Sequence, residues 1–202
     1  MANEPIELSD EQKIELRRRL SDQYWRLNNL YWIQDVNGCK VKFKMNAVQE
    51  DLYWNMHLLS VVPKSRQHGC STLIDLLMLD ICLFNANKTG GIIDRTDTDG
   101  QKKLGKLRFA YEHLDDPDDP ETCEIGTLIK LSVPIVRASE HEIRFGNESQ
   151  IWTATSLRGG TVQFLHISEL GPIAYADPIK AEEIRTGAFN TVHPGNRIVI
   201  ES

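Results

Sequence analysis

The chain has 202 residues, of which 41% are hydrophobic, and this suffices for the core of one medium-sized domain with a small appendage. Its formal net charge of -6 argues against a protein that coats nucleic acid over its whole surface, so any DNA contact is expected on one face only. The four cysteines lack CxxC spacing and no apolar run has the length of a membrane span, so we expect a soluble intracellular protein with reduced thiols and no structural zinc.

The first part of the chain predicts a helix followed by a β-hairpin. A capping-box pattern begins at Ser9, and apolar residues then recur at helical spacing over 11–30. The segment 32–43 alternates around Asn37-Gly38, a dipeptide typical of two-residue hairpin turns. We therefore expect residues 1–42 to form an N-terminal helix and hairpin appendage.

The remainder, 43–202, alternates strand-like and helical patterns. Segment 121–154 contains β-type runs around Gly146-Asn147 and is interpreted as a hairpin insertion. Helices are expected at 46–57, 71–87, 99–114 and 178–186, and strands at 58–62, 91–94, 162–167 and 197–200. Such alternation predicts an α/β fold with a mainly parallel sheet flanked by helices.

The loop after the strand at 58–62 leads directly into a helix, a place where backbone N–H groups and the helix dipole hold phosphates. It departs from the pattern GxxxxGK[ST], because Lys64 stands where the first glycine would be and Cys70 takes the lysine position. A turn of this kind also occurs in α/β proteins without any ligand, so the loop alone leaves both interpretations open. The candidate phosphate-binding residues are Lys64, Ser65, Arg66, Gln67, His68, Gly69, Cys70, Ser71 and Thr72.

An ATPase with such a loop needs acidic residues at the end of a second strand, one supporting Mg²⁺ and one polarising the attacking water. The strand at 162–167 ends in Ser168-Glu169, where the usual pair is Asp-Glu. Glu169 is therefore the candidate for water activation, whereas Ser168 would act on a metal only through another ligand. A lone glutamate at this place can also simply end a buried strand at the surface.

Together these segments resemble the large subunit of phage terminases, the ATPases that package viral DNA. The resemblance runs from about Arg26 to Ser202 and rests on the order and spacing of its motifs. The motifs are Lys-Ser-Arg-Gln-x-Gly at 64–69, Ser-Leu-Arg-Gly-Gly-Thr at 156–161, Leu-His-Ile-Ser-Glu at 165–169, Glu-Ile-Arg-Thr-Gly-Ala at 183–188 and Ile-Val-Ile-Glu-Ser at 198–202.

The resemblance implies a P-loop NTPase core of the RecA/ASCE-like type that uses ATP and Mg²⁺. Lys64 would contact the phosphates from the start of the loop, and Ser71 would bind Mg²⁺. Glu169 would activate water, and Arg158 would reach the nucleotide of an adjacent subunit as an arginine finger. Gln49 would read adenine. Judged from the residues alone, Arg158 is a loop arginine and Gln49 a solvated helix side chain.

The resemblance also implies double-stranded viral DNA, the portal protein and the terminase small subunit as partners, self-association into a ring, and a place in the host cell cytoplasm away from membranes. In that family the strand at 197–200 lies between the strands at 162–167 and 58–62, and a separate nuclease domain follows the ATPase. No nuclease is expected in this chain, and the ATPase core is expected to be partial. Two alternatives stay open: a catalytically incompetent fragment that binds nucleotide or packaging partners without turnover, and a helicase-like ATPase of another pathway.

Overall fold

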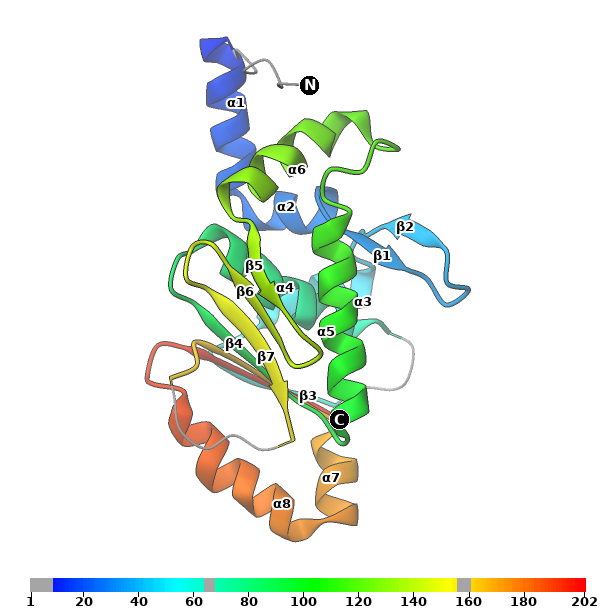
Figure 1. The fold of residues 1–202 in the computed structure, drawn as a ribbon. Helices are drawn as coiled ribbons and strands as arrows, with labels where there is room; N and C mark the ends of the chain where they lie inside the picture. Colours follow the sequence, from blue (N-terminus) through cyan, green and yellow to red (C-terminus); the bar gives the residue numbers. More distant parts are fainter. Residues whose placement is uncertain (1–8, 64–67, 156–160) are drawn as a thin grey trace.

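A computed structural model describes residues 9–63, 68–155 and 161–202 (Figure 1). The strands of its central sheet are β3 (Leu59–Val62), β4 (Thr89–Ile93), β5 (Ile135–Ala138), β6 (Glu142–Phe145), β7 (Gln150–Ala154), β8 (Phe164–Ser168) and β9 (Arg197–Glu201). This seven-stranded sheet has the order β3-β9-β8-β4-β7-β6-β5. The strands from β3 to β7 in this order run parallel, whereas β6 and β5 are antiparallel. The expected position of β9 between β3 and β8 is confirmed, and β3 is an outer strand of the sheet.

Helices cover both faces of the sheet (Figure 1). One face carries α4 (Cys70–Phe84) and α5 (Asp97–Glu112), and the other carries α7 (Leu170–Ala176), α8 (Pro178–Glu183) and the π-helix η1 (Ile184–Ala188), which a 3-10 turn, η2 (Phe189–Thr191), follows. Alternate residues of β8 divide between the two cores, since Phe164 packs with α4 and Leu165 packs with the η1 side. The predicted α/β fold with a mainly parallel sheet flanked by helices is thus confirmed.

The N-terminal helix is broken into two, contrary to the single helix expected over 11–30. It forms α1 (Asp10–Ser21) and α2 (Gln23–Asn29), because the Asp22 side chain accepts a hydrogen bond from the Trp25 backbone N–H at 3.1 Å and so starts a new helix.

The hairpin β1 (Trp32–Gln34) and β2 (Lys40–Lys42) forms as expected, but its turn is longer than two residues. Gly38 has a φ of 79°, whereas Asn37 does not join it among the described residues of positive φ. The Asp35 carboxylate instead closes the turn by accepting from the backbone N–H groups of Asn37 and Cys39.

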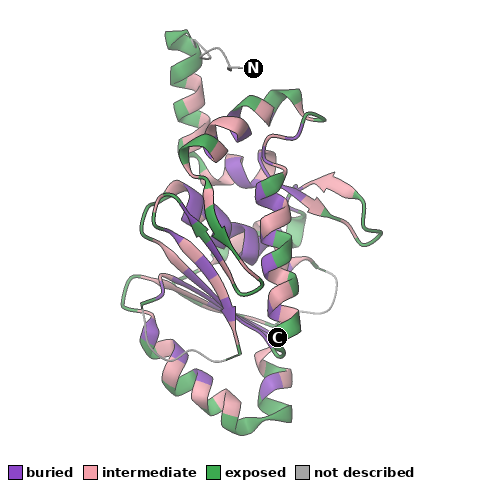
Figure 2. Cartoon of the chain, in the orientation of Figure 1, coloured by how far each residue is buried: buried purple, intermediate pink, exposed green. Residues whose placement is uncertain are grey.

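The appendage packs into the main core. Leu27, Leu30 and Tyr31 belong to the same buried cluster as α4, which Figure 2 shows as one of the most buried elements. A division of the chain after residue 42 stays a prediction.

A helix, α6 (Pro120–Ser132), occupies the start of the segment that was expected to be β-type. Asp119 caps it and Pro120 opens it, and its buried residues Thr122, Ile125, Gly126 and Ile129 follow helical spacing. The β-branched and Leu residues of this segment conceal that spacing. The hairpin that follows is also not an insertion, because β7 pairs with β4 and extends the parallel sheet.

The acidic segment 115–119 is only partly exposed. Asp116 is buried and accepts from Lys40 Nζ at 2.7 Å, and Asp119 accepts from Lys42 Nζ. These ion pairs join the β1–β2 hairpin to the start of α6.

A buried ion pair ties α2 to α4. Asp80 is fully buried and accepts from Arg26 Nη2 at 2.6 Å and Nε at 2.8 Å, and from the Tyr31 hydroxyl at 2.9 Å. Burial, followed by the charge of Asp80, raises the pKa of Tyr31 well above its ordinary value, so this phenol stays a donor.

Candidate functional site

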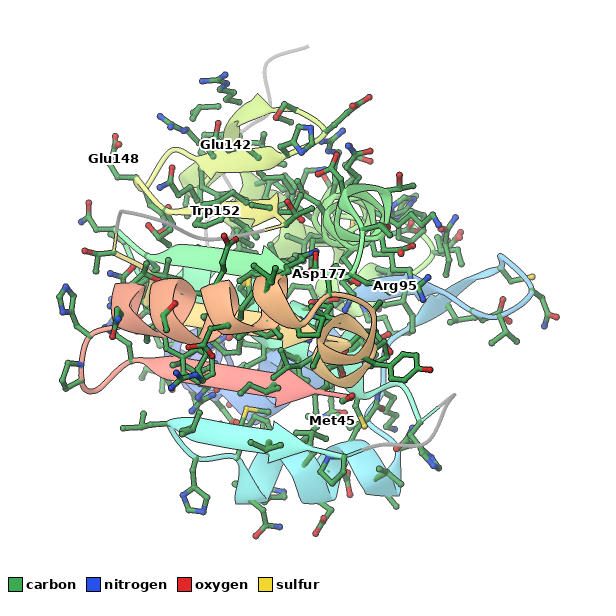
Figure 3. All side chains as sticks on the ribbon, turned by 90° about the horizontal axis from the view of Figure 1, so that it is seen from below. Met45, Arg95, Glu142, Glu148, Trp152 and Asp177 are labelled. Carbon is green, nitrogen blue, oxygen red and sulfur yellow. The ribbon has the colours of Figure 1, made fainter. Side chains whose placement is uncertain are left out.

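The carboxyl ends of strands β8 and β9 lie together where α4 begins, and we call this end of the sheet the site edge. Ser168 and Glu201 are the last residues of the two strands and pair across the sheet, and Ser71 lies in the first turn of α4. Arg95, which follows β4, marks this edge in Figure 3, and Glu148, which precedes β7, marks the opposite edge. In open α/β sheets, ligands bind outside the carboxyl ends of the strands.

The carboxylate of Glu201 is the centre of this edge. Its Oε1 accepts from Ser71 Oγ at 2.6 Å and from Ser168 Oγ at 3.0 Å, and lies 3.2 Å from His166 Nε2 and 3.4 Å from Lys103 Nζ. The side chain is fully buried. Burial alone would raise the pKa of Glu201, but His166, Lys103 and Ser71 outweigh it and hold the pKa well below its ordinary value. Glu201 is therefore a buried, charged carboxylate.

Further charges extend from Glu201 across the sheet. The fully buried His166 ring places Nδ1 2.7 Å from Asp75 Oδ1 of α4, and Lys103 Nζ lies 3.5 Å from Asp94 Oδ2 beyond β4. Burial and the charge of Lys103 lower the pKa of His166, but the nearby carboxylates prevail and raise it. Burial likewise lowers the pKa of Lys103, and the charges of Asp75, Glu201 and Asp94 raise it further than burial lowers it. These opposite charges stabilise one another in a place that excludes water.

The end of the candidate phosphate loop is fixed by helix α3 (Ala47–Asn55). Gln49 is buried, donates from Nε2 to the Gly69 carbonyl at 2.7 Å, and accepts from the Asn46 N–H at 3.0 Å. Asn46 in turn donates to the His68 carbonyl at 3.2 Å. Gln49 is thus not the solvated side chain that its helical position suggests. Its role toward adenine stays a prediction, since its amide contacts the loop backbone.

Gly69 turns the loop into α4. Its φ of 71° lies in the left-handed region that glycine adopts without strain, and a Cβ here would lie 2.7 Å from Gln49 Nε2. Cys70 follows as a buried side chain. Glycine has no side-chain oxygen, so the cap residue itself offers no acceptor to the first turn of α4.

A solvent-open hollow of about 300 Å³ adjoins this loop. Its lining includes Lys42, Lys44, Gln49, His68 and Thr72, and its volume is at the lower end of the range for small-molecule sites. Lys42 is paired with Asp119, so the positive charge beside the start of α4 comes from Lys44.

Glu169 directly follows β8 at the same edge and begins α7. It has a φ of 60°, an uncommon backbone conformation for a glutamate, and it is partly exposed. The remaining candidates, Lys64, Ser65, Arg66 and Gln67 of the loop and Arg158, lie outside the described residues.

Sequence reasoning missed three residues of this site, namely His166, Lys103 and Glu201. The expected sheet order contained a usable signal for Glu201, because it follows the apolar run at 197–200 on the strand expected next to the loop strand. His166 and Lys103 carry no such signal, since their partners come from distant segments.

The described residues offer oxygen donors of the kind that Mg²⁺ prefers, namely two hydroxyls and a carboxylate. Mg²⁺ in phosphate-binding sites usually keeps waters and takes substrate phosphates as its other ligands. Among those same residues there is no group of three or more His, Cys, Asp or Glu that would itself hold a metal ion. The donor set around Ser71 fits an ion that arrives with a nucleotide.

No protein-family model and no curated protein matches this sequence. Among solved structures, the large terminase ATPase domain of Thermus phage P74-26 aligns with 79% of this chain at 14% identity and a TM-score of 0.52. An arginine-to-alanine mutant of that domain aligns over the same share at 14% identity, with a TM-score of 0.56. This chain has the fold of a phage large-terminase ATPase domain. The chain spans 65% of the length of each of these two chains. The fold that the motifs led us to expect is confirmed.

None of the described helices has the length and apolarity needed to cross a bilayer.

Proposed function

We propose that this chain is the ATPase domain of a viral DNA-packaging motor and hydrolyses ATP with Mg²⁺ to move DNA into a procapsid. The observation that carries the proposal is the 2.6 Å hydrogen bond from Ser71 to Glu201, beside the candidate phosphate loop, in a terminase ATPase fold. The motor works in the host cell cytoplasm. Its partners are double-stranded viral DNA, the portal protein, the small terminase subunit and further copies of this chain in a ring.

Each site residue has a separate task in the proposed reaction. Lys64 and the backbone at the start of α4 bind the phosphates, and the Ser71 hydroxyl holds the metal. Mg²⁺, when bound, neutralises charge on the β- and γ-phosphates. Glu169 orients the attacking water and accepts its proton, and Arg158 of a neighbouring subunit stabilises charge on the transferred group. Gln49 positions the loop and binds the adenine ring of ATP beside it.

A second candidate is a fragment that binds nucleotide or packaging partners without turnover. Two substitutions favour it, because Cys70 takes the usual place of the lysine and Ser168 that of the aspartate. Both side chains are buried at the site edge rather than exposed. The two candidates share nucleotide binding and differ in hydrolysis.

Calorimetric titration with Mg·ATPγS tests the binding that both candidates require. Wild-type protein is expected to bind saturably, and Lys64→Ala is expected to lose about tenfold or more in affinity, since a hydrogen bond to a charged group contributes roughly 1.5–3 kcal/mol. Binding is measured instead of turnover because the proposed reaction needs Arg158 of a neighbouring subunit. A single subunit lacks this arginine and would hydrolyse ATP slowly even with an intact site.

Lys13→Ala is the matched control. Lys13 lies on α1 and pairs with Asp10 on the surface, so its loss is expected to leave the affinity unchanged. Absence of saturable binding by the wild-type protein would contradict the proposed function.

A further inference from the structure

The strand β8 lacks the carboxylate that would stand beside Ser71. It ends in Ser168, whose hydroxyl lies on the same face of the sheet as His166, two residues earlier. Glu201 is the register partner of Ser168 on the neighbouring strand β9. A carboxylate is therefore present at the same level of the sheet, but one strand closer to β3.

We propose that Glu201 replaces the missing aspartate of β8 as the carboxylate of the Mg²⁺ site. This inference rests on the proposed function. Ser71 donates its hydroxyl proton to Glu201 at 2.6 Å, so toward a metal the hydroxyl oxygen acts as an acceptor, as a metal ligand must. Carboxylates that orient a metal-binding group in this way also raise its basicity and set metal affinity.

The identity of residue 168 supports the placement of this carboxylate on β9 instead of β8. Ser168 Oγ lies 3.0 Å from Glu201 Oε1 and donates to it. An aspartate at 168 would bring two carboxylates into contact, and such like charges disfavour each other. The small hydroxyl instead makes room for Glu201 and adds a hydrogen bond. Ser168 is thus the complement of Glu201.

The surroundings hold Glu201 in its charged form and in place. His166 Nε2 and Lys103 Nζ lie 3.2 Å and 3.4 Å from the same oxygen. His166 is itself fixed by Asp75, and Lys103 by Asp94. Since two cationic groups and two hydroxyls hold this buried carboxylate, it is preorganised toward Ser71 before any ion binds.

The test compares ATPγS affinity with Mg²⁺ and in EDTA for three proteins: wild type, Glu201→Gln and the double variant Glu201→Ser/Ser168→Asp. For Glu201→Gln, the ratio of the affinity with Mg²⁺ to the affinity in EDTA is expected to fall about 10- to 100-fold below the wild-type ratio. The double variant returns the carboxylate to β8 and is expected to recover most of the gain in affinity that Mg²⁺ provides. Electron paramagnetic resonance of Mn·ATPγS gives a second reading of metal affinity.

The outcomes separate this inference from the proposed function. If wild-type protein binds ATPγS and Glu201→Gln keeps the full Mg²⁺ gain, Glu201 has no part in the metal site. If the wild-type protein does not bind ATPγS, the proposed function itself is wrong. Thermal unfolding of each variant without nucleotide checks folding. Should Glu201→Gln fail to fold, the double variant decides, because a folded double variant without a Mg²⁺ gain would overturn the inference.

Discussion

Glu169→Ala is expected to lower the rate of ATP hydrolysis by about 10²- to 10⁴-fold, the contribution that a general base makes. Glu169 follows β8 at the site edge, where Ser71 and Glu201 meet. Its φ of 60° ends the extended conformation of the strand. Alanine removes the carboxylate but none of the proposed phosphate contacts. Mg·ATPγS binding is therefore expected to persist while phosphate release under excess ATP is lost.

Glu148→Ala is the matched control for this experiment. Glu148 is an exposed glutamate with a φ of 63°, so its replacement removes the same charge from the same kind of backbone conformation. It lies at the opposite edge of the sheet from Arg95 (Figure 3), and its hydrolysis rate is expected to equal that of the wild type. Equal background rates for wild type and Glu169→Ala would instead favour the fragment without turnover.

Asp80→Ala is expected to lower the free energy of unfolding by about 3–5 kcal/mol, the cost of leaving a buried charge without its partner. Arg26 is itself buried and its guanidinium donates twice to Asp80. The change also removes the acceptor of the buried Tyr31 hydroxyl. Urea unfolding followed by circular dichroism measures the loss.

Asp118→Ala provides the surface counterpart. Asp118 also accepts from a lysine, Lys40, at 2.7 Å, but its side chain is 70% exposed. Such surface pairs contribute about 0–1 kcal/mol. A loss for Asp80→Ala as small as that for Asp118→Ala would show that the Arg26–Asp80 pair does not hold α2 against α4.

Local patterns predicted the parts of the fold whose signals are local. Ser9 caps its helix as its spacing indicates, and the alternation of strands and helices after residue 43 gives the parallel sheet. The place of β9 came from the family resemblance. Helix α6 was missed because β-branched residues and Leu obscured its helical period, and the break at Asp22 was missed because the helical pattern continues through it.

The site was only partly predictable for a different reason. Ser71 and Glu201 are 130 residues apart in sequence, and only the sheet order brings them together. The importance of Glu201 follows from four neighbours on other elements, none of which its own sequence context reveals. Gln49 was singled out through the resemblance, yet its contact with the Gly69 carbonyl depends on how α3 meets the loop.

A crystal structure of the complex with Mg·ATPγS measures most directly whether the edge formed by β3, β9 and β8 is a nucleotide site. The β- and γ-phosphates are expected within hydrogen-bond distance of backbone N–H groups at the start of α4, with the ion beside Ser71 and Glu201. A nucleotide bound elsewhere on the molecule, with this edge unchanged, would contradict that assignment.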